Sequence, residues 1–254
     1  MKKTSEITNL LQELKLKGMT RVIERELARA DKLASPLSEV LIRLLTEEKG
    51  YRRERSFLYR LKKARLAWPW TLDSFPFDLQ PGVSKMQIMG LSGLGFMERA
   101  ENIVFIGDPG AGKTGLAMGL LRQAITSGYH GRFFKAQELL DELYASLADR
   151  SSARLLKSLS AYDILVIDEL GYLTLNSEQV NAFFKLMEER YNKKSTIITT
   201  NLDYPQWYDL FGRKSLVDAL LDRLHHHCIT IRINGPSLRT KDSQNPNQKN
   251  IPKD

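Results

Sequence analysis

The stretch Asn102–Thr114, NIVFIGDPGAGKT, decides the fold of this chain. An apolar run, Ile103 to Ile106, enters a glycine-rich turn that closes on Gly112-Lys113-Thr114. The spacing G-x-x-x-x-G-K-[ST] is that of a phosphate-binding loop, in which glycines let successive backbone N–H groups point at one anion. The helix expected at 115–123 presents its positive N-terminal end to the same phosphates.

The loop therefore predicts nucleotide binding. Lys113 is expected to reach the β- and γ-phosphates, and the Thr114 hydroxyl to ligate Mg²⁺. A chance match on a glycine-rich turn is the alternative, but a strand before the loop and a helix after it make coincidence rare. The predicted nucleotide-binding residues are Gly107, Asp108, Pro109, Gly110, Ala111, Gly112, Lys113 and Thr114.

Acidic and amide side chains follow two later apolar runs. DILVIDE, Asp163–Glu169, places Asp168 at the carboxyl end of a buried strand, beside the loop, where it can hold Mg²⁺. Glu169 comes next and can polarise a water for attack on the γ-phosphate. Asn201 ends another strand and can orient water there. The alternatives are acids that merely end a strand and a turn residue at Asn201.

Strands and helices alternate after the loop, which predicts an α/β fold with a parallel sheet, helices on both faces and ligands at the carboxyl ends of the strands. The expected strands are 131–135, 163–168, 195–200 and 229–233, and the expected helices are 136–147, 177–190 and 216–224.

The first quarter of the chain predicts a small helical domain. Apolar residues recur at helical spacing over 4–33, with a break expected at Gly18, over 37–45 and over 51–67. Residues 1–66 hold 17 Lys and Arg against 9 Asp and Glu, whereas the remainder holds 21 of each. This excess predicts binding of double-stranded DNA with little sequence preference, the alternative being a solvated helical surface. The candidate DNA contacts are Arg52, Arg53, Arg55, Arg60, Lys62, Lys63 and Arg65.

The expected domain order is a basic DNA-binding and oligomerisation domain at 1–67, an ordered aromatic-rich linker at 68–84, an ATPase domain at 85–239 and a disordered polar tail at 240–254. A single cysteine, Cys228, excludes an intrachain disulfide and fits a reducing cytosol. The run His225-His226-His227-Cys228 does not have the spacing of a zinc site. No apolar stretch is long enough to predict a membrane span.

The motifs GDPGAGKT, DILVIDELGY, IITTNL and LVDALLDRL carry a resemblance to AAA+ ATPases. More narrowly, the chain resembles the IstB-like subgroup, ATPases encoded beside the transposase in two-gene bacterial insertion sequences, which are similar to the helicase loader DnaC. The resemblance covers most of the chain, including LLQELKLKGMT near the start and DSFPFDLQPG before the loop.

The resemblance implies roles for individual residues. Lys113 and Thr114 match Walker A, and Asp168 and Glu169 match Walker B. Asn201 matches sensor 1, Arg223 the arginine finger that reaches the γ-phosphate of a neighbouring subunit, and Arg239 the late arginine that senses nucleotide. Arg213 is a rival finger, and Arg154 and Lys157 are candidate pore residues.

The function that the resemblance implies is a transposition helper with ATPase activity in the bacterial cytoplasm. It is expected to form an ATP-dependent homo-oligomer on DNA, to deliver the DNA to a cognate transposase and to disassemble on hydrolysis, using ATP and Mg²⁺. The rival interpretations are a replicative helicase loader, a small-molecule kinase with the same loop, and a DNA-binding scaffold that does not hydrolyse ATP.

Overall fold

The computed structural model of the protein describes residues 2–66, 70–171 and 173–240. The expected disordered tail at 240–254 lies, apart from its first residue, outside these residues. The chain divides into two compact units, Met1–Arg60 and Leu61–Asp254. Across the described part of the chain, every helix is too short or too polar to cross a membrane.

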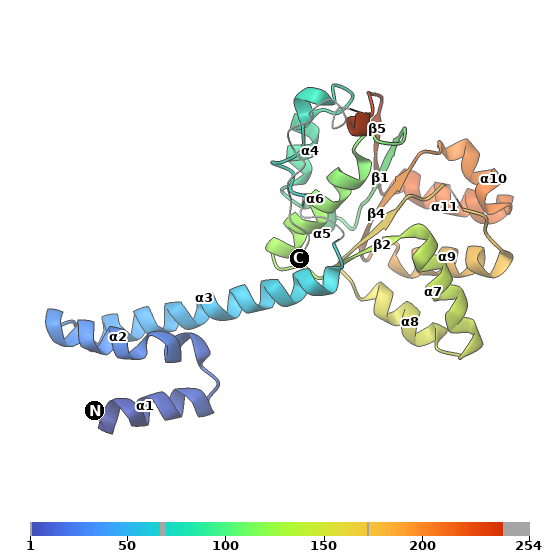
Figure 1. Ribbon diagram of the computed structural model, residues 1–254. Coiled ribbons are helices and arrows are strands. Elements are labelled where there is room, and N and C mark those ends of the chain that lie inside the picture. The colour runs from blue at the N-terminus through green and yellow to red at the C-terminus, as the bar shows by residue number, and fades with distance from the viewer. Residues whose placement is uncertain (1, 67–69, 172, 241–254) are drawn as a thin grey trace. The chain divides into compact units, whose positions relative to one another are not determined.

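The first unit consists of helices (Figure 1). These are α1 (Lys2–Glu13), α2 (Lys17–Leu33) and the portion of α3 (Leu37–Ala64) that ends at Arg60. A small core of α2 residues Met19, Val22 and Ile23 packs with Val40 and Leu44 of α3. The amphipathic pattern in the sequence thus corresponds to a packed apolar face.

Two expectations for this unit are wrong. Helix α3 is continuous, although two helices were expected over the same residues. Gly50 lies inside it with open space around the position of a side chain, and one exposed glycine costs a helix only about 1 kcal/mol. The break near the start of the chain falls at residues 14–16 and not at Gly18, because Lys15 takes a left-handed conformation with φ of 57°.

Gly18 is instead required by helix packing. It lies in the first turn of α2, and a Cβ there would come within 2.7 Å of the Glu48 Cα atom of α3. The Glu48 carboxylate accepts hydrogen bonds from the backbone N–H groups of Gly18 (2.7 Å) and Met19 (3.2 Å). A side chain from α3 therefore satisfies the free donors at the start of α2.

The second unit is built on a parallel sheet with strand order β2-β3-β4-β1-β5. The strands are β1 (Asn102–Gly107), β2 (Gly131–Lys135), β3 (Ile164–Asp168), β4 (Ser195–Thr200) and β5 (Cys228–Ile233). Each lies within one residue of its predicted range at either end, so the predicted parallel α/β fold is confirmed.

Helices cover both faces of this sheet (Figure 1). Helix α6 (Lys113–Thr126) packs on one face. The other face carries a continuous apolar core with α7 (Ala136–Ala148), α8 (Ser152–Ser160), α9 (Ser177–Arg190), α10 (Trp207–Phe211) and α11 (Lys214–His226). The sequence did not predict α8 and α10, which are short. Alternate strand residues such as Val104 and Ile106 face this core, as the two-residue period of a strand requires.

Local sequence fixes where some of these helices begin. Helix α9 starts with a capping box in which the Asn176 side chain accepts from the Gln179 N–H and the Gln179 side chain accepts from the Asn176 N–H. Asn176 is therefore the cap of α9. Before β1, the chain forms the 3₁₀ turn Phe77–Leu79 and helices α4 (Lys85–Leu91) and α5 (Gly95–Glu98).

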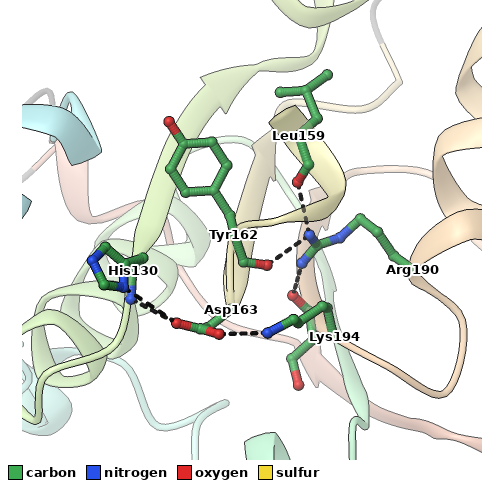
Figure 2. Close-up of polar contacts among 7 residues, drawn as sticks. His130, Leu159, Tyr162, Asp163, Arg190 and Lys194 are labelled. Atoms are coloured by element: carbon green, nitrogen blue, oxygen red, sulfur yellow. Dashed lines mark hydrogen bonds and ion pairs between the residues drawn. The ribbon is translucent and has the colours of Figure 1, made fainter. Parts of the chain in front are cut away.

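A buried arginine joins the strands at their amino ends (Figure 2). Arg190, only 1% exposed, donates to the carbonyl oxygens of Leu159 (3.0 Å), Tyr162 (2.9 Å) and Ser195 (2.5 Å) and to the Thr196 hydroxyl (3.0 Å). Burial lowers the pKa of Arg190 to about 10, which leaves it charged at neutral pH.

An ion pair lies beside Arg190 at the same end of the sheet. The Asp163 carboxylate accepts from Lys194 Nζ at 2.6 Å and from the His130 backbone N–H at 2.9 Å (Figure 2). Burial acts to raise the pKa of Asp163, but the bond from Lys194 and that N–H outweigh it, and the pKa is lowered. The carboxylate is therefore stabilised in its charged form.

Candidate functional site

The phosphate loop between β1 and α6 depends on two glycines with left-handed backbone conformations. Gly110 has φ of 83° and Gly112 has φ of 94°, values that other residues rarely adopt. A Cβ at Gly110 would collide with the Ser237 hydroxyl, and the Leu238 N–H donates to the Gly110 carbonyl at 2.9 Å. The segment after β5 thus lies directly against the loop.

Lys113 stands at the start of α6 and is tied to its own loop. Its Nζ donates to the carbonyl oxygens of Gly107 (2.7 Å) and Asp108 (2.9 Å). Burial lowers the pKa of Lys113, while the carboxylates of Asp168 and Asp108 act in the opposite direction. Asp108 itself is exposed. The ammonium is therefore held at the loop by carbonyls that a phosphate can replace.

Asp168, at the carboxyl end of β3, is a buried carboxylate between two hydroxyls. It is 2% exposed, and its Oδ1 accepts from Thr114 Oγ1 at 2.8 Å and from Thr199 Oγ1 at 2.5 Å. Burial raises the pKa of Asp168 even though both hydroxyls favour the charged form. A carboxylate and a hydroxyl oxygen side by side are the kinds of ligand that Mg²⁺ takes in a phosphate site, so the chemistry of these residues fits the predicted ion.

Glu169 follows Asp168 and has an unusual backbone conformation. Its φ of 62° is left-handed, a conformation that costs free energy and is concentrated at functional sites. The Thr199 hydroxyl stabilises this turn by accepting the Glu169 N–H at 2.9 Å, while donating to Asp168. The Glu169 side chain is exposed at the edge of the sheet. Thr199 was not among the predicted site residues. The feature of the sequence that could have identified it is its place in Thr199-Thr200-Asn201, at the carboxyl end of a predicted strand.

Asn201 follows β4 and reaches the turn after Glu169. A Cβ placed on Gly171 would collide with the Asn201 Oδ1 atom. The sheet order sets β4 between β1 and β3, so the carboxyl ends of three adjacent strands bring together the phosphate loop, the two acids and this amide. This is the edge at which ligands bind in open parallel sheets.

The three candidate arginines lie in different surroundings. Arg223 of α11 pairs with Glu188 of α9 at 3.2 Å, with its side chain 32% exposed. Arg213 donates to the Asn181 side chain of α9 at 3.2 Å. Arg239 is exposed, and its charge acts on Lys113 to lower the pKa of that lysine. The charge of Arg239 thus acts on Lys113 of the loop within one chain.

The segment before β1 also packs on the phosphate loop. A Cβ on Gly112 would come within 2.7 Å of the Phe75 ring. The fully buried Gln80 donates from Nε2 to the carbonyl oxygens of Ala111 (3.1 Å) and Pro236 (3.0 Å). Gln80 thus joins the loop to the segment after β5. The sequence did not single out Phe75 or Gln80, although the density of aromatic residues at 68–84 was the signal for packing.

The candidate DNA contacts fall in both units. Arg52, Arg53, Arg55 and Arg60 belong to the first unit, and Lys62, Lys63 and Arg65 to the second. Arg52 pairs with Glu48 at 2.7 Å, and Arg60 donates to Ser56 at 2.6 Å. Arg154 and Lys157, the candidate pore residues, are exposed on α8. Contact of any of these residues with DNA stays a prediction.

Within residues 2–66, 70–171 and 173–240, no three His, Cys, Asp or Glu side chains gather as a metal site. Cys228 packs against the core at the start of β5. Burial raises the pKa of its thiol to about 11, so the thiol is protonated at neutral pH and unsuited to nucleophilic chemistry.

Comparison with known proteins assigns a family. The family described as "IstB-like ATP binding protein" matches residues 9–246. A Pseudomonas aeruginosa protein of insertion sequence IS21, named for ATP binding, is 38% identical over 94% of this chain and 90% of its own length. A similarly named protein of insertion sequence IS232 from Bacillus thuringiensis subsp. berliner is 35% identical over 93% of this chain and 95% of its own.

Solved structures give the fold. The crystal structure of the DnaC helicase loader is 27% identical, with a TM-score of 0.58, and covers 67% of this chain and 100% of the other. DnaI, at 18% identity, has a TM-score of 0.57 over 65% of this chain and 92% of the other, which indicates a shared fold alone. The predicted AAA+ core is confirmed.

Proposed function

The chain belongs to the IstB-like ATP binding protein family, and on that premise we propose that it is an ATPase that helps a transposase by assembling on target DNA. The observation that supports hydrolysis most directly is the pair of acids at the end of β3. Asp168 is buried between two hydroxyls, and Glu169 is exposed and has a left-handed backbone conformation. One acid is thus suited to hold a metal ion and the other to activate water.

Different residues of this chain have different roles in the proposed reaction. Lys113 exchanges its two loop carbonyls for the β- and γ-phosphates of ATP. Thr114 and Asp168 would hold Mg²⁺, which would supply positive charge against the phosphate oxygens. Glu169 accepts the proton of the attacking water, and Asn201 orients that water. The positions of these side chains around one edge of the sheet support the proposed roles.

Assembly supplies the remaining charge. Arg223 lies on the surface of the ATPase unit, paired with a carboxylate that is itself 64% exposed. Such a pair is weak, so Arg223 can exchange Glu188 for the γ-phosphate held by a neighbouring protomer. ATP then favours the oligomer, and hydrolysis removes the contact and promotes disassembly. Arg239 senses the nucleotide within its own chain.

The first 66 residues provide a positively charged surface for duplex DNA, since they carry the whole net charge of +8. Binding through phosphates has little sequence preference and weakens with salt. The oligomer formed on DNA then presents it to the transposase encoded with this ATPase.

A replicative helicase loader is the second candidate, favoured by the similarity to DnaC at 27% identity. The insertion-sequence relatives are more similar and match over more than nine tenths of this chain. Stimulation of ATP hydrolysis by a transposase, with no stimulation by a replicative helicase, separates the two candidates.

The test is sedimentation of the chain with duplex DNA, with and without ATP, compared among the wild type, Glu169→Gln and Arg223→Ala. We expect ATP to drive large DNA-bound assemblies that Glu169→Gln traps and Arg223→Ala abolishes. A wild-type chain that stays monomeric and ignores DNA in every nucleotide state contradicts the proposal.

A further inference from the structure

A groove in the first unit lies between the turn that joins α1 to α2 and the middle of α3. Its volume is about 400 Å³. Three cations line it, Lys15 from the turn and Arg52 and Arg55 from α3, together with hydroxyls of Tyr51, Ser56 and Tyr59. We propose that this groove binds the phosphate backbone of duplex DNA through Lys15 and Arg55, an inference that rests on the proposed function.

The charge of the groove is positive after internal pairing. Its one acidic lining residue, Glu48, is 5% exposed and already accepts from the N–H groups of Gly18 and Met19 and from Arg52. Glu48 therefore joins the start of α2 to α3 beneath the groove, and its negative charge offsets the positive charge of Arg52. Lys15 and Arg55 remain exposed at its rim, and Arg21 adds a further charge nearby, 4.5 Å above the Tyr51 ring.

Lys15 occupies a backbone position that glycine usually takes in proteins. The Leu16 N–H donates to the Leu11 carbonyl and the Lys15 N–H to the Gln12 carbonyl, at 2.8 and 2.9 Å. This is the pattern of a Schellman turn, in which the left-handed residue is most often glycine. A lysine at φ of 57° is strained, and its ammonium lines the groove. The left-handed turn thus sets the charged Lys15 side by side with Arg52 and Arg55 in the lining of the groove.

The predicted DNA contacts on α3 differ in whether they line the groove. Arg52 and Arg55 line it, whereas Arg53 does not. At 100° per residue, Arg53 lies about 100° around α3 from Arg52 and about 160° from Arg55. Glu47 and Glu54, the nearby acids of α3, are not lining residues of the groove. Neither Asn nor Gln, the side chains that pair with adenine, lines the groove, which fits recognition of the backbone.

The test measures DNA affinity of the full chain by fluorescence anisotropy over a range of salt concentrations. The groove variant is Lys15→Gln/Arg55→Gln. The matched control is Arg29→Gln/Lys32→Gln, which removes one arginine and one lysine from the same unit at exposed positions outside the groove. We expect the groove variant to reduce the salt slope by about 2 and the affinity roughly tenfold, and the control to change the affinity less than about twofold.

A second variant separates binding from folding. Lys15→Gly removes the charge but suits the left-handed backbone, so we expect an unchanged or higher melting temperature together with roughly threefold weaker DNA binding. A groove variant that matches the wild type in salt slope, or that loses no more affinity than the control, overturns the inference while the proposed function stands. A wild-type chain that binds no DNA overturns the proposed function itself.

Discussion

The two ends of the central sheet treat buried charge in opposite ways. At the amino ends of the strands, Arg190 has four oxygen acceptors, and Asp163 has a lysine and a backbone N–H (Figure 2). At the carboxyl ends, Asp168 is buried with two hydroxyls as donors, and Lys113 bonds only to carbonyls of its own loop. Burial is common to both ends, but the carboxylate at the amino ends has an ammonium and an N–H as donors, whereas the carboxylate at the carboxyl ends has hydroxyls.

This difference shows in the pKa values of the two acids. The pKa of Asp163 is lowered, because Lys194 and the His130 N–H outweigh the burial that raises it. The pKa of Asp168 is raised, since burial outweighs the hydroxyls of Thr199 and Thr114. Folding therefore favours the charged form of Asp163 and disfavours the charged form of Asp168, which a bound cation could stabilise.

The largest expected effect is loss of the amino-end network. Arg190→Met leaves three buried carbonyls and a threonine hydroxyl without their donor, so we expect the free energy of unfolding of the ATPase unit to fall by about 3–5 kcal/mol. Thermal denaturation measures it. Lys185→Met, at an exposed position on the same helix, is the control, and an equal loss in both variants would refute the comparison.

The second effect concerns Lys113. We expect Lys113→Met to change the stability of the free protein by no more than about 1 kcal/mol, because its ammonium makes only two exchangeable bonds. The stabilisation by saturating MgATP, about 2.7 kcal/mol at a hundredfold excess over Kd, should disappear. Melting temperatures with and without MgATP measure both quantities. A full ATP-induced shift in the variant would show that Lys113 does not bind phosphate.

The third effect is a gain in the free energy of unfolding. Asp168→Asn should stabilise the ligand-free protein at neutral pH by about 0.5–1 kcal/mol, because folding raises the pKa of Asp168 and so disfavours its ionised form. The gain is present at neutral pH and vanishes below about pH 4, where the carboxyl is neutral in both folded and unfolded chains. Denaturant unfolding across this pH range measures it.

Asp163 should behave in the opposite way, which provides the control for Asp168. Its folded-state pKa is lowered, so its stabilisation is present above about pH 4, the pKa of the unfolded chain, and is lost as pH falls through the folded-state pKa. Asp163→Asn should therefore destabilise the protein at neutral pH by about 1 kcal/mol. If both substitutions move stability in the same direction at neutral pH, the contrast between the two ends fails.

The smallest expected effect is on the Arg223–Glu188 pair. Both side chains are partly exposed, so Glu188→Gln should change the stability of the monomer by less than about 0.5 kcal/mol. If Arg223 acts on a neighbouring protomer, its release from Glu188 should leave ATP-dependent assembly intact, whereas Arg223→Ala should abolish it. Loss of assembly in Glu188→Gln would instead assign the pair itself to the interface between protomers.

The sequence singled out the candidate site wherever residue type and spacing form a motif together. The phosphate loop, Asp168 and Glu169 were proposed because phosphate chemistry calls for glycines, a lysine and carboxylates in one order along the chain, and the structure brings these residues to one edge of the sheet. The strands were found because each is a short buried apolar run. Their order then brought Asn201 to the same edge.

Tertiary contacts decided what the sequence did not predict. Gly18 was taken as a helix break, but its role is close packing against Glu48, a residue thirty positions away. Thr199 is one of several threonines until β4 pairs beside β3 and places its hydroxyl between Asp168 and the Glu169 N–H. Gln80 is an ordinary polar residue until its two carbonyl partners are known.

The contacts of Phe75 and Gln80 determine where a fragment that contains the parallel sheet and the phosphate loop should begin. A fragment that starts at Lys85, the predicted domain boundary, lacks the ring that covers Gly112 and the amide that joins Ala111 to Pro236. Such a fragment would retain every nucleotide motif of the sequence and yet have an unsupported phosphate loop. Expression of a catalytic fragment should begin upstream of Trp70, so that the loop keeps the cover that the full chain provides.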